Sequence, residues 1–387
     1  MIHLHSKDNL ALTPISHEQP FISKITTNAE LPAPLRSAHT LLWEAGYDQL
    51  PVGFGLVLIP AIDAQNQALH SHTNVLRLAP QLAYLKDHDV IKFHPMDSDI
   101  NVLYRWGANS NSFLITERCN SFCIMCSQPP RDIDDHYLVD DMLAALPLIH
   151  QDTAEIGITG GEPTLWGDNF IRLIQASKAH LPRTSLHILS NGRNFRNLEL
   201  ATKVAHIKHP DLMIGIPLYA DYSQLHDFIV QADNAFDDTI RGILNLKRCR
   251  VPVEIRVVIH QKNYHRLPRL AEFITRNLLF VDHIAFMGLE IMGFAKSNLE
   301  ALWIDPYDYR NELEEAVNTL SRYGMHVSIY NHPLCVIPAS VRRFSVRSIS
   351  DWKNDFLEEC QSCKFMQECG GFFSSNLKKT SAHIKAL

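Results

Sequence analysis

Seven of the eight cysteines in this 387-residue chain fall into two groups with short spacings. The first group contains Cys119, Cys123 and Cys126, and the second contains Cys335, Cys360, Cys363 and Cys369. In a reducing compartment, clustered cysteines bind metals or act in redox chemistry more often than they form structural disulfides. The two groups are therefore candidate metal centres, whereas the isolated Cys249 is interpreted as a buried free thiol.

The first group has the spacing Cys-x3-Cys-x2-Cys and directly follows a predicted strand at residues 112–116. Three thiolates on a 4Fe–4S cluster leave one iron without a protein ligand, and catalytic metal sites keep such an open position. A structural zinc site needs four ligands, and no fourth Cys or His lies at a suitable spacing here. On spacing alone, redox thiols or a zinc knuckle remain alternatives.

The second group offers four thiolates, with Cys360, Cys363 and Cys369 in a Cys-x2-Cys-x5-Cys run. Four thiolates can bind all four corners of a second 4Fe–4S cluster. They can equally hold one structural zinc ion in a tetrahedral site. The spacing does not decide between these two metals.

From residue 112 onward, apolar strand-like runs alternate with helical stretches. Strands are expected at 112–116, 154–159, 185–189, 212–217, 253–259 and 283–289, and helices at 139–149, 169–180, 237–250 and 267–279. Strands with crossover helices between them predict a parallel α/β sheet, curled into a barrel or partial barrel. The carboxyl ends of such strands are where ligands bind, and the first cysteine group lies at one of them.

The flanking regions have different patterns. Short β-like runs at 53–58, 75–78, 89–94 and 102–106 predict a small β-rich domain before the barrel. A helix at 307–323, a strand at 325–330 and the second cysteine group follow the barrel. We therefore expect a leader and β-rich domain at 1–110, a barrel at 111–295, and a connector with a cysteine-rich domain at 296–387.

Two further motifs follow the second and third predicted strands. They are Gly160-Gly161-Glu162-Pro163 and Ile188-Leu189-Ser190-Asn191-Gly192. Together with the Cys-x3-Cys-x2-Cys loop, and in this order, they resemble the radical S-adenosylmethionine (SAM) superfamily. The resemblance implies an α/β partial (β/α)6 barrel, a 4Fe–4S cluster and SAM, which is cleaved reductively to a 5′-deoxyadenosyl radical.

The resemblance also implies cofactor contacts. Gly160 and Gly161 allow close backbone approach to a ligand, and the Glu162 carboxylate can accept hydrogen bonds from the SAM ammonium. Ser190 and Asn191 offer short hydrogen-bonding side chains to the ribose. Pro163, the last residue of the glycine motif, is also expected to bind the cofactor.

Two other residues are candidates for SAM contacts. Met125 stands where the family often has an aromatic residue, and we expect a largely backbone contact to the adenine there. Arg256, on the fifth predicted strand, is a candidate for the SAM carboxylate. A structural arginine paired within the core is an equal alternative for Arg256, because a buried charge needs a partner.

The C-terminal segment that carries the second cysteine group indicates a particular subgroup of the superfamily. Its cysteine run is similar to the core of SPASM or twitch auxiliary-cluster domains, and implies one auxiliary cluster. Four segments resemble the HxsC-type radical SAM maturases of His-Xaa-Ser peptide systems: Val102–Arg105, Cys126–Pro130, Ser348–Asn354 and Gly370–Phe373. This resemblance implies a small, ribosomally made precursor peptide as substrate, a second radical SAM maturase as partner, and a reductant such as flavodoxin or ferredoxin.

Two other functions are compatible with these motifs. The first is a radical SAM enzyme that acts on a small molecule in cofactor or metabolite biosynthesis. The second is a non-catalytic adaptor stabilised by zinc, which would not cleave SAM. The adaptor leaves the ordered glycine and Ser-Asn-Gly motifs unexplained.

Composition limits the class of protein. With 46% hydrophobic and 20% charged residues, the chain has the profile of a soluble globular protein. Its net charge of −6 argues against binding to nucleic acid, which requires clustered cations. The polar start at 1–14 lacks a signal-peptide core, and the apolar run at 53–62 is too short to span a bilayer. We therefore expect a cytoplasmic protein without a membrane partner.

Overall fold

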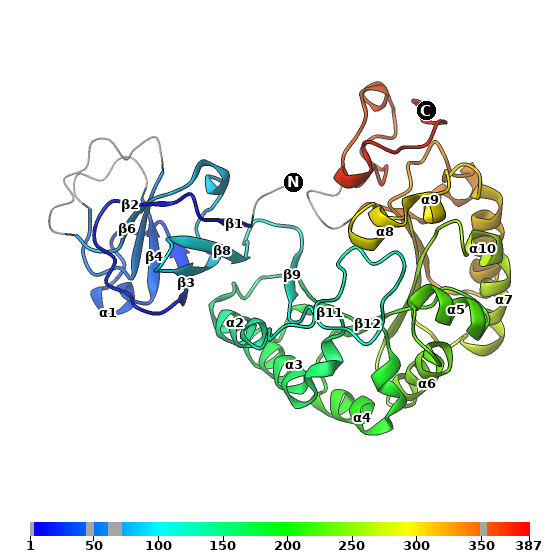
Figure 1. The fold of residues 1–387 in the computed structure, drawn as a ribbon, viewed down its shortest axis with the longest axis horizontal. Helices are drawn as coiled ribbons and strands as arrows, with labels where there is room; N and C mark the ends of the chain where they lie inside the picture. The colour runs from blue at the N-terminus through cyan, green and yellow to red at the C-terminus, as the bar shows by residue number, and fades with distance from the viewer. Residues whose placement is uncertain (1–3, 44–49, 61–71, 349–353) are drawn as a thin grey trace. The chain divides into compact units, whose positions relative to one another are not determined.

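The computed structural model describes residues 4–43, 50–60, 72–348 and 354–387. The chain divides into two compact units, the first made of residues 1–113, 136–156 and 176–184 and the second of the remainder (Figure 1). The expected boundaries near 110 and 295 stay predictions. Most of the Ser348–Asn354 segment, which carries part of the finer resemblance, lies outside the described residues.

The first unit contains an eight-stranded mixed sheet with the order β1-β8-β7-β3-β4-β5-β6-β2. Its strands are β1 (His5–Ser6), β2 (Leu10–Ala11), β3 (Phe21–Thr26), β4 (His39–Leu42), β5 (Leu56–Ile59), β6 (Val75–Arg77), β7 (Val90–His94) and β8 (Asp99–Tyr104). Leu56 and Leu58 pack into one apolar cluster and Val57 and Ile59 into another, so β5 is covered on both faces. The expected β-rich N-terminal region is confirmed.

Two short helices belong to the first unit, α1 (Ala33–Arg36) and α2 (Tyr137–Ala145). Lys92 on β7 donates to both carboxylate oxygens of Asp141 on α2, each at 2.8 Å. Tyr104 at the end of β8 shares a hydrogen bond of 2.7 Å with the Thr153 hydroxyl. These contacts explain why the segment around α2 groups with the sheet that precedes it in the sequence.

The second sheet has the order β16-β15-β14-β13-β12-β11-β10-β9. Its strands are β9 (Asn111–Leu114), β10 (Glu155–Thr159), β11 (Ser185–Leu189), β12 (Leu212–Pro217), β13 (Val253–Val258), β14 (His283–Met287), β15 (Val327–Tyr330) and β16 (Ser345–Val346). Every pairing from β11 to β16 is parallel. The predicted α/β partial barrel is confirmed.

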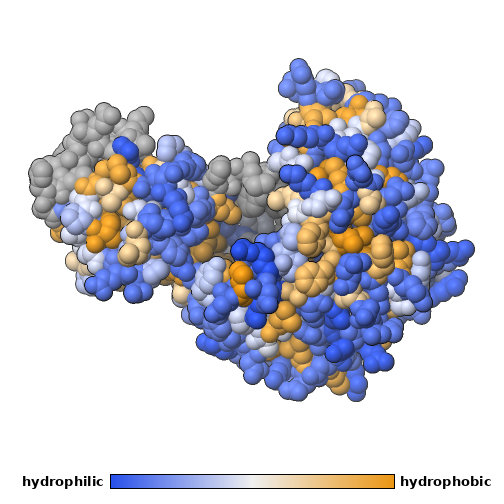
Figure 2. Space-filling model, viewed as in Figure 1, coloured by the Kyte–Doolittle hydropathy of each residue, from blue (hydrophilic) through white to orange (hydrophobic). Residues whose placement is uncertain are grey.

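Helices connect these strands, and most of them lie on the outer side of the curved sheet (Figure 1). They are α3 (Asp168–His180), α4 (Leu198–Ile207), α5 (Ser223–Val230), α6 (Ala235–Arg248), α7 (Leu267–Asn277), α8 (Gly293–Ser297), α9 (Leu299–Leu302) and α10 (Arg310–Arg322). The apolar face of α7 includes Leu267, Leu270 and Ile274, all buried. Figure 2 shows a mainly hydrophilic surface on the viewed face of the second unit, with smaller hydrophobic groups.

The loops after β9 and β10 are joined through their backbones. Gly161 N donates to Thr116 O and Glu162 N donates to Arg118 O, both at 2.8 Å. A Cβ on Gly161 would lie 2.1 Å from Arg118 O, which no side chain can tolerate. The glycine expected to face a ligand is thus also required for contact between the two loops.

We predict that Gly161→Ala destabilises the second unit by about 1–3 kcal/mol, because the added methyl forces the two loops apart. The matched control is Gly107→Ala, where the nearest atoms belong to the flexible end of Lys86. Thermal unfolding of both variants measures the effect. Equal stability of the two variants would contradict this explanation.

Candidate functional site

The first cysteine group lies in a loop that protein contacts hold on several sides. We call residues 116–126 the cluster loop. The Thr116 hydroxyl donates to Asp135 at 2.9 Å, and Glu117 N donates to the same carboxylate oxygen at 2.5 Å. Further along, Phe122 N and Ile124 N donate to the carbonyl oxygens at 230 and 229, at the end of α5. The loop conformation is therefore fixed by its neighbours.

The three cysteines of this loop share one electrostatic environment. Burial raises the pKa of Cys119 to about 11 and that of Cys123 to about 12, and the neighbouring thiolates add to both increases. Burial also raises the pKa of Cys126. Three neighbouring, half-buried thiols ionise together only beside a compensating cation, and a coordinated metal supplies one. The donor set therefore fits an iron–sulfur cluster.

Glu162 connects the loops that follow β10 and β11. Its side chain is fully buried, and one oxygen accepts from Thr164 N at 3.0 Å and from the Ser190 hydroxyl at 2.8 Å. The Thr164 hydroxyl also donates to this oxygen, while Asn191 N donates to the other at 2.6 Å. Burial raises the pKa of Glu162, and these hydrogen bonds oppose the increase. All these partners are protein groups, so the contact with the SAM ammonium stays a prediction.

Pro163 begins a 3-10 helix at Pro163–Trp166, and Glu162 caps it by accepting from Thr164 N. A second 3-10 helix, Arg193–Arg196, follows Gly192, whose φ of 80° suits glycine. The motif residues thus form two turns at the same edge of the sheet.

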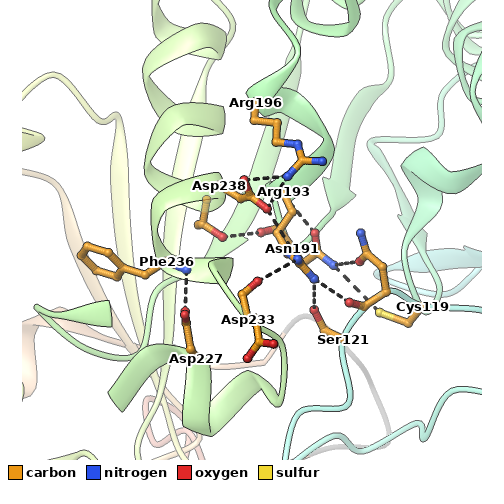
Figure 3. Close-up of polar contacts among 11 residues, drawn as sticks. Cys119, Ser121, Asn191, Arg193, Arg196, Asp227, Asp233, Phe236 and Asp238 are labelled. Atoms are coloured by element: carbon orange, nitrogen blue, oxygen red, sulfur yellow. Dashed lines mark hydrogen bonds and ion pairs between the residues drawn. The ribbon is translucent and has the colours of Figure 1, made fainter. Parts of the chain in front are cut away.

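Asn191 points toward the cluster loop. Its amide nitrogen donates to the Asn120 side chain at 2.6 Å and lies 3.9 Å from the Cys119 sulfur (Figure 3). Arg193 Nη1 donates to Asn120 O at 2.6 Å. The structure therefore brings the Ser-Asn-Gly motif to the cysteines, as expected, but its asparagine contacts the protein. The ribose contacts of Ser190 and Asn191 stay predictions.

Met125 is buried in an apolar cluster that includes Tyr219, Ile229 and Leu289. Burial, with the charges of Cys123 and Cys126, raises the pKa of Tyr219 well above its usual value. Tyr219 is thus a phenol beside the cysteines that the sequence analysis missed. Its position just after β12, at the carboxyl edge of the sheet, was the available indication.

Arg256 takes part in a polar network on the sheet. Its Nη1 donates to Glu254 at 2.5 Å, and its Nη2 contacts the Met287 sulfur at 3.2 Å. Glu254 also pairs with His283 at 2.7 Å. Burial raises the pKa of Glu254, but the His283 hydrogen bond and the Arg256 charge outweigh burial and lower it to about 2. Glu254 is the partner that a structural arginine at 256 requires. The contact of Arg256 with SAM stays a prediction.

The four tail cysteines line one hollow, together with Phe356 and Met366. Backbone N–H groups of Leu334 and Gly371 donate to the Cys369 sulfur at 3.4 and 3.5 Å. Hydrogen bonds of this kind stabilise thiolates that bind metal. The structure thus brings Cys335, Cys360, Cys363 and Cys369 together.

Two features are absent from the part of the chain that the structure describes. No three His, Cys, Asp or Glu side chains among the described residues are arranged for a single metal ion. No helix in that part of the chain has the length and apolar content needed to cross a membrane.

Residues 113–274 match the family model of the radical SAM superfamily. The chain carries a radical SAM domain. The cofactors of this domain are a 4Fe–4S cluster and SAM, and the matched residues contain the cluster loop and both motifs.

Sequence and structure comparisons also found similar proteins. An uncharacterized protein of Methanocaldococcus jannaschii is 26% identical over 221 residues, which cover 55% of this chain and 71% of that protein. The structure of anSMEcpe with bound AdoMet and the Kp18Cys peptide has a TM-score of 0.50 at 15% identity, covering 72% of this chain and 92% of that one. Its likeness supports the fold of the radical SAM domain.

Streptococcus suis SuiB bound to S-adenosylmethionine aligns with a TM-score of 0.48 at 16% identity. The alignment covers 58% of this chain and 51% of SuiB. The chain therefore matches only about half the length of SuiB.

We predict that Glu162→Gln lowers the stability of the radical SAM domain by about 1–3 kcal/mol, because the new amide group faces donors and leaves some of them unpaired. Glu117→Gln is the control, since Glu117 pairs with the exposed Arg131 at 2.9 Å. Thermal unfolding compares the two. A Glu162→Gln protein as stable as the control would show that the buried carboxylate is dispensable.

The pH dependence of stability gives another prediction. His226 and His260 lie beside Tyr219, and burial lowers the pKa of each to about 3. The unfolded chain binds these protons near pH 6.5 and the folded chain does not, so stability falls as the pH drops below 6.5. The loss is about 1 kcal/mol per histidine per pH unit.

The test compares thermal unfolding of the wild type and His226→Gln between pH 7 and 5. We expect a shallower pH dependence for the variant, because one titrating group has been removed. An identical pH dependence would refute the assignment of a buried neutral His226.

Proposed function

We propose that this chain is a peptide maturase of the HxsC type, which uses radical SAM chemistry to modify a small, ribosomally made precursor peptide. The observation that carries the proposal is the junction of three loops at one edge of the sheet. Glu162 links the glycine motif to the Ser-Asn-Gly motif, and both contact the cluster loop. The order of these motifs resembles that of the radical SAM superfamily and supports a SAM site at this junction.

In the proposed site, Cys119, Cys123 and Cys126 hold the cluster, and the Gly160–Pro163 and Ser190–Asn191 loops surround SAM. When bound, the cluster and SAM supply one-electron cleavage of the sulfonium bond and a 5′-deoxyadenosyl radical for hydrogen abstraction. The protein contributes the fixed cluster loop and the hydrogen bonds that join it to the neighbouring loops. Buried residues such as Met125 exclude water from the site.

Support for a peptide substrate comes from the tail. Cys335, Cys360, Cys363 and Cys369 line one hollow, and their spacing resembles auxiliary-cluster domains of peptide-modifying members. The structures of SuiB and anSMEcpe include complexes with a precursor peptide and with the Kp18Cys peptide. Cytoplasmic location, a second maturase and a flavodoxin or ferredoxin donor complete the proposal.

The first experiment measures iron, zinc and reductive SAM cleavage after anaerobic reconstitution. We predict that Cys119→Ala abolishes SAM cleavage, because the cluster loses one of its three thiolates. A variant with alanine at 119, 123 and 126 should retain about half the iron, since each of the two clusters holds four irons. The control is Cys249→Ala, at the isolated cysteine, which should retain full iron and full cleavage.

Unchanged SAM cleavage in Cys119→Ala would exclude the assigned cluster site. A triple variant that loses all iron but keeps zinc would make the tail structural and remove its support for a peptide substrate. Capture of a peptide encoded beside this chain, measured by binding to the full-length protein, separates the maturase from an enzyme that acts on a small molecule.

A further inference from the structure

Arg193 lies beside the cluster loop and contacts the segment between two of the cysteines. Its Nη1 donates to Asn120 O at 2.6 Å and reaches the Ser121 hydroxyl oxygen at 3.4 Å. Its Nη2 donates to Asp233 O at 3.3 Å (Figure 3). The side chain is only 16% exposed. One guanidinium therefore fixes the backbone between Cys119 and Cys123 from outside the loop.

The charge of Arg193 is only partly neutralised. Its carboxylate partner is Asp238, at 3.5 Å, and Asp238 also pairs with Arg196 at 2.9 Å. Two arginines share one carboxylate, so the trio keeps a net positive charge. Arg196 is 59% exposed and screened by water, whereas Arg193 is largely shielded. The positive electrostatic potential of this group is therefore strongest on the side of the cluster loop.

This charge acts on its surroundings. Burial lowers the pKa of His226 to about 3, and the positive charge of Arg193 contributes to the decrease. The guanidinium also lies against the backbone between Cys119 and Cys123, so its charge is close to the predicted iron ligands.

We propose that Arg193 is a positioning residue that raises the reduction potential of the cluster held by the cluster loop. The inference rests on the proposed function. On reduction the cluster takes up one electron from a one-electron donor and gains one negative charge, and no bond is made or broken in this step. A nearby shielded cation stabilises the reduced cluster more than the oxidised one.

The test is a redox titration with dithionite and mediators, followed by electron paramagnetic resonance, on the reconstituted full-length protein. The relevant signal is the one that disappears in Cys119→Ala. Arg193→Gln removes the charge and retains a hydrogen-bond donor, so we expect the ratio of reduced to oxidised cluster at a given potential to fall about tenfold, or ~59 mV for one electron.

Two variants separate charge from contact. Arg193→Lys keeps the charge, and we expect a smaller shift than in Arg193→Gln. Arg196→Gln removes the exposed arginine that shares Asp238 and does not touch the cluster loop. We expect a smaller shift than in Arg193→Gln, because water screens an exposed charge. Iron content is measured for every variant.

A wild-type potential in Arg193→Gln, or an equal shift in Arg196→Gln, overturns the inference. If Arg193→Gln loses its iron, Arg193→Lys decides. A lysine variant with iron and a near-wild-type potential supports the role of charge, whereas loss of iron there too makes Arg193 merely structural. A wild-type protein without a signal that depends on Cys119 overturns the proposed function as well, so the two failures are distinguishable.

Discussion

The arrangement of the site depends on one buried anion. A carboxylate out of water costs several kcal/mol unless its oxygens are hydrogen-bonded, so Glu162 requires its donors to be present together. Those donors belong to Thr164, Ser190 and Asn191, on the loops after β10 and β11. Backbone hydrogen bonds from Gly161 and Glu162 extend the same constraint to the cluster loop. These hydrogen bonds fix three chain segments relative to one another, and none of the bonds involves a cysteine side chain.

Much of the barrel was predictable because parallel strands that are buried on both faces appear in the sequence as short apolar runs. The bounds of β11 and β12, Ser185–Leu189 and Leu212–Pro217, agree to the residue with the expectation. Helices α4 and α5 were missed, since both are short and α5 buries a histidine at 226. The strands β1 and β2 have two residues each, too few for any periodicity.

The site was predictable only in part, for a different reason. Cysteine spacing and motif order are local properties of the sequence, and they correctly placed the three loops at one edge. The contacts of Arg193 are not local, because Asp233 and Asp238 approach it from α6 and the turn before it. Likewise, the sequence does not reveal the hydrogen bond between Arg256 and Glu254, which depends on both side chains lying on one face of β13.

The cluster loop also takes hydrogen bonds from segments that come much later in the chain. Phe122 N bonds to the carbonyl at 230, Phe294 N bonds to Cys126 O, and the Asn298 side chain bonds to Ile124 O. Since a chain emerges from the ribosome N-terminus first, these partners are missing while the cysteines are already exposed. The three cysteines of this loop therefore reach the positions described here only after residue 298 has been synthesised. The cluster loop is thus completed late in folding, after the segments that close around it have been made.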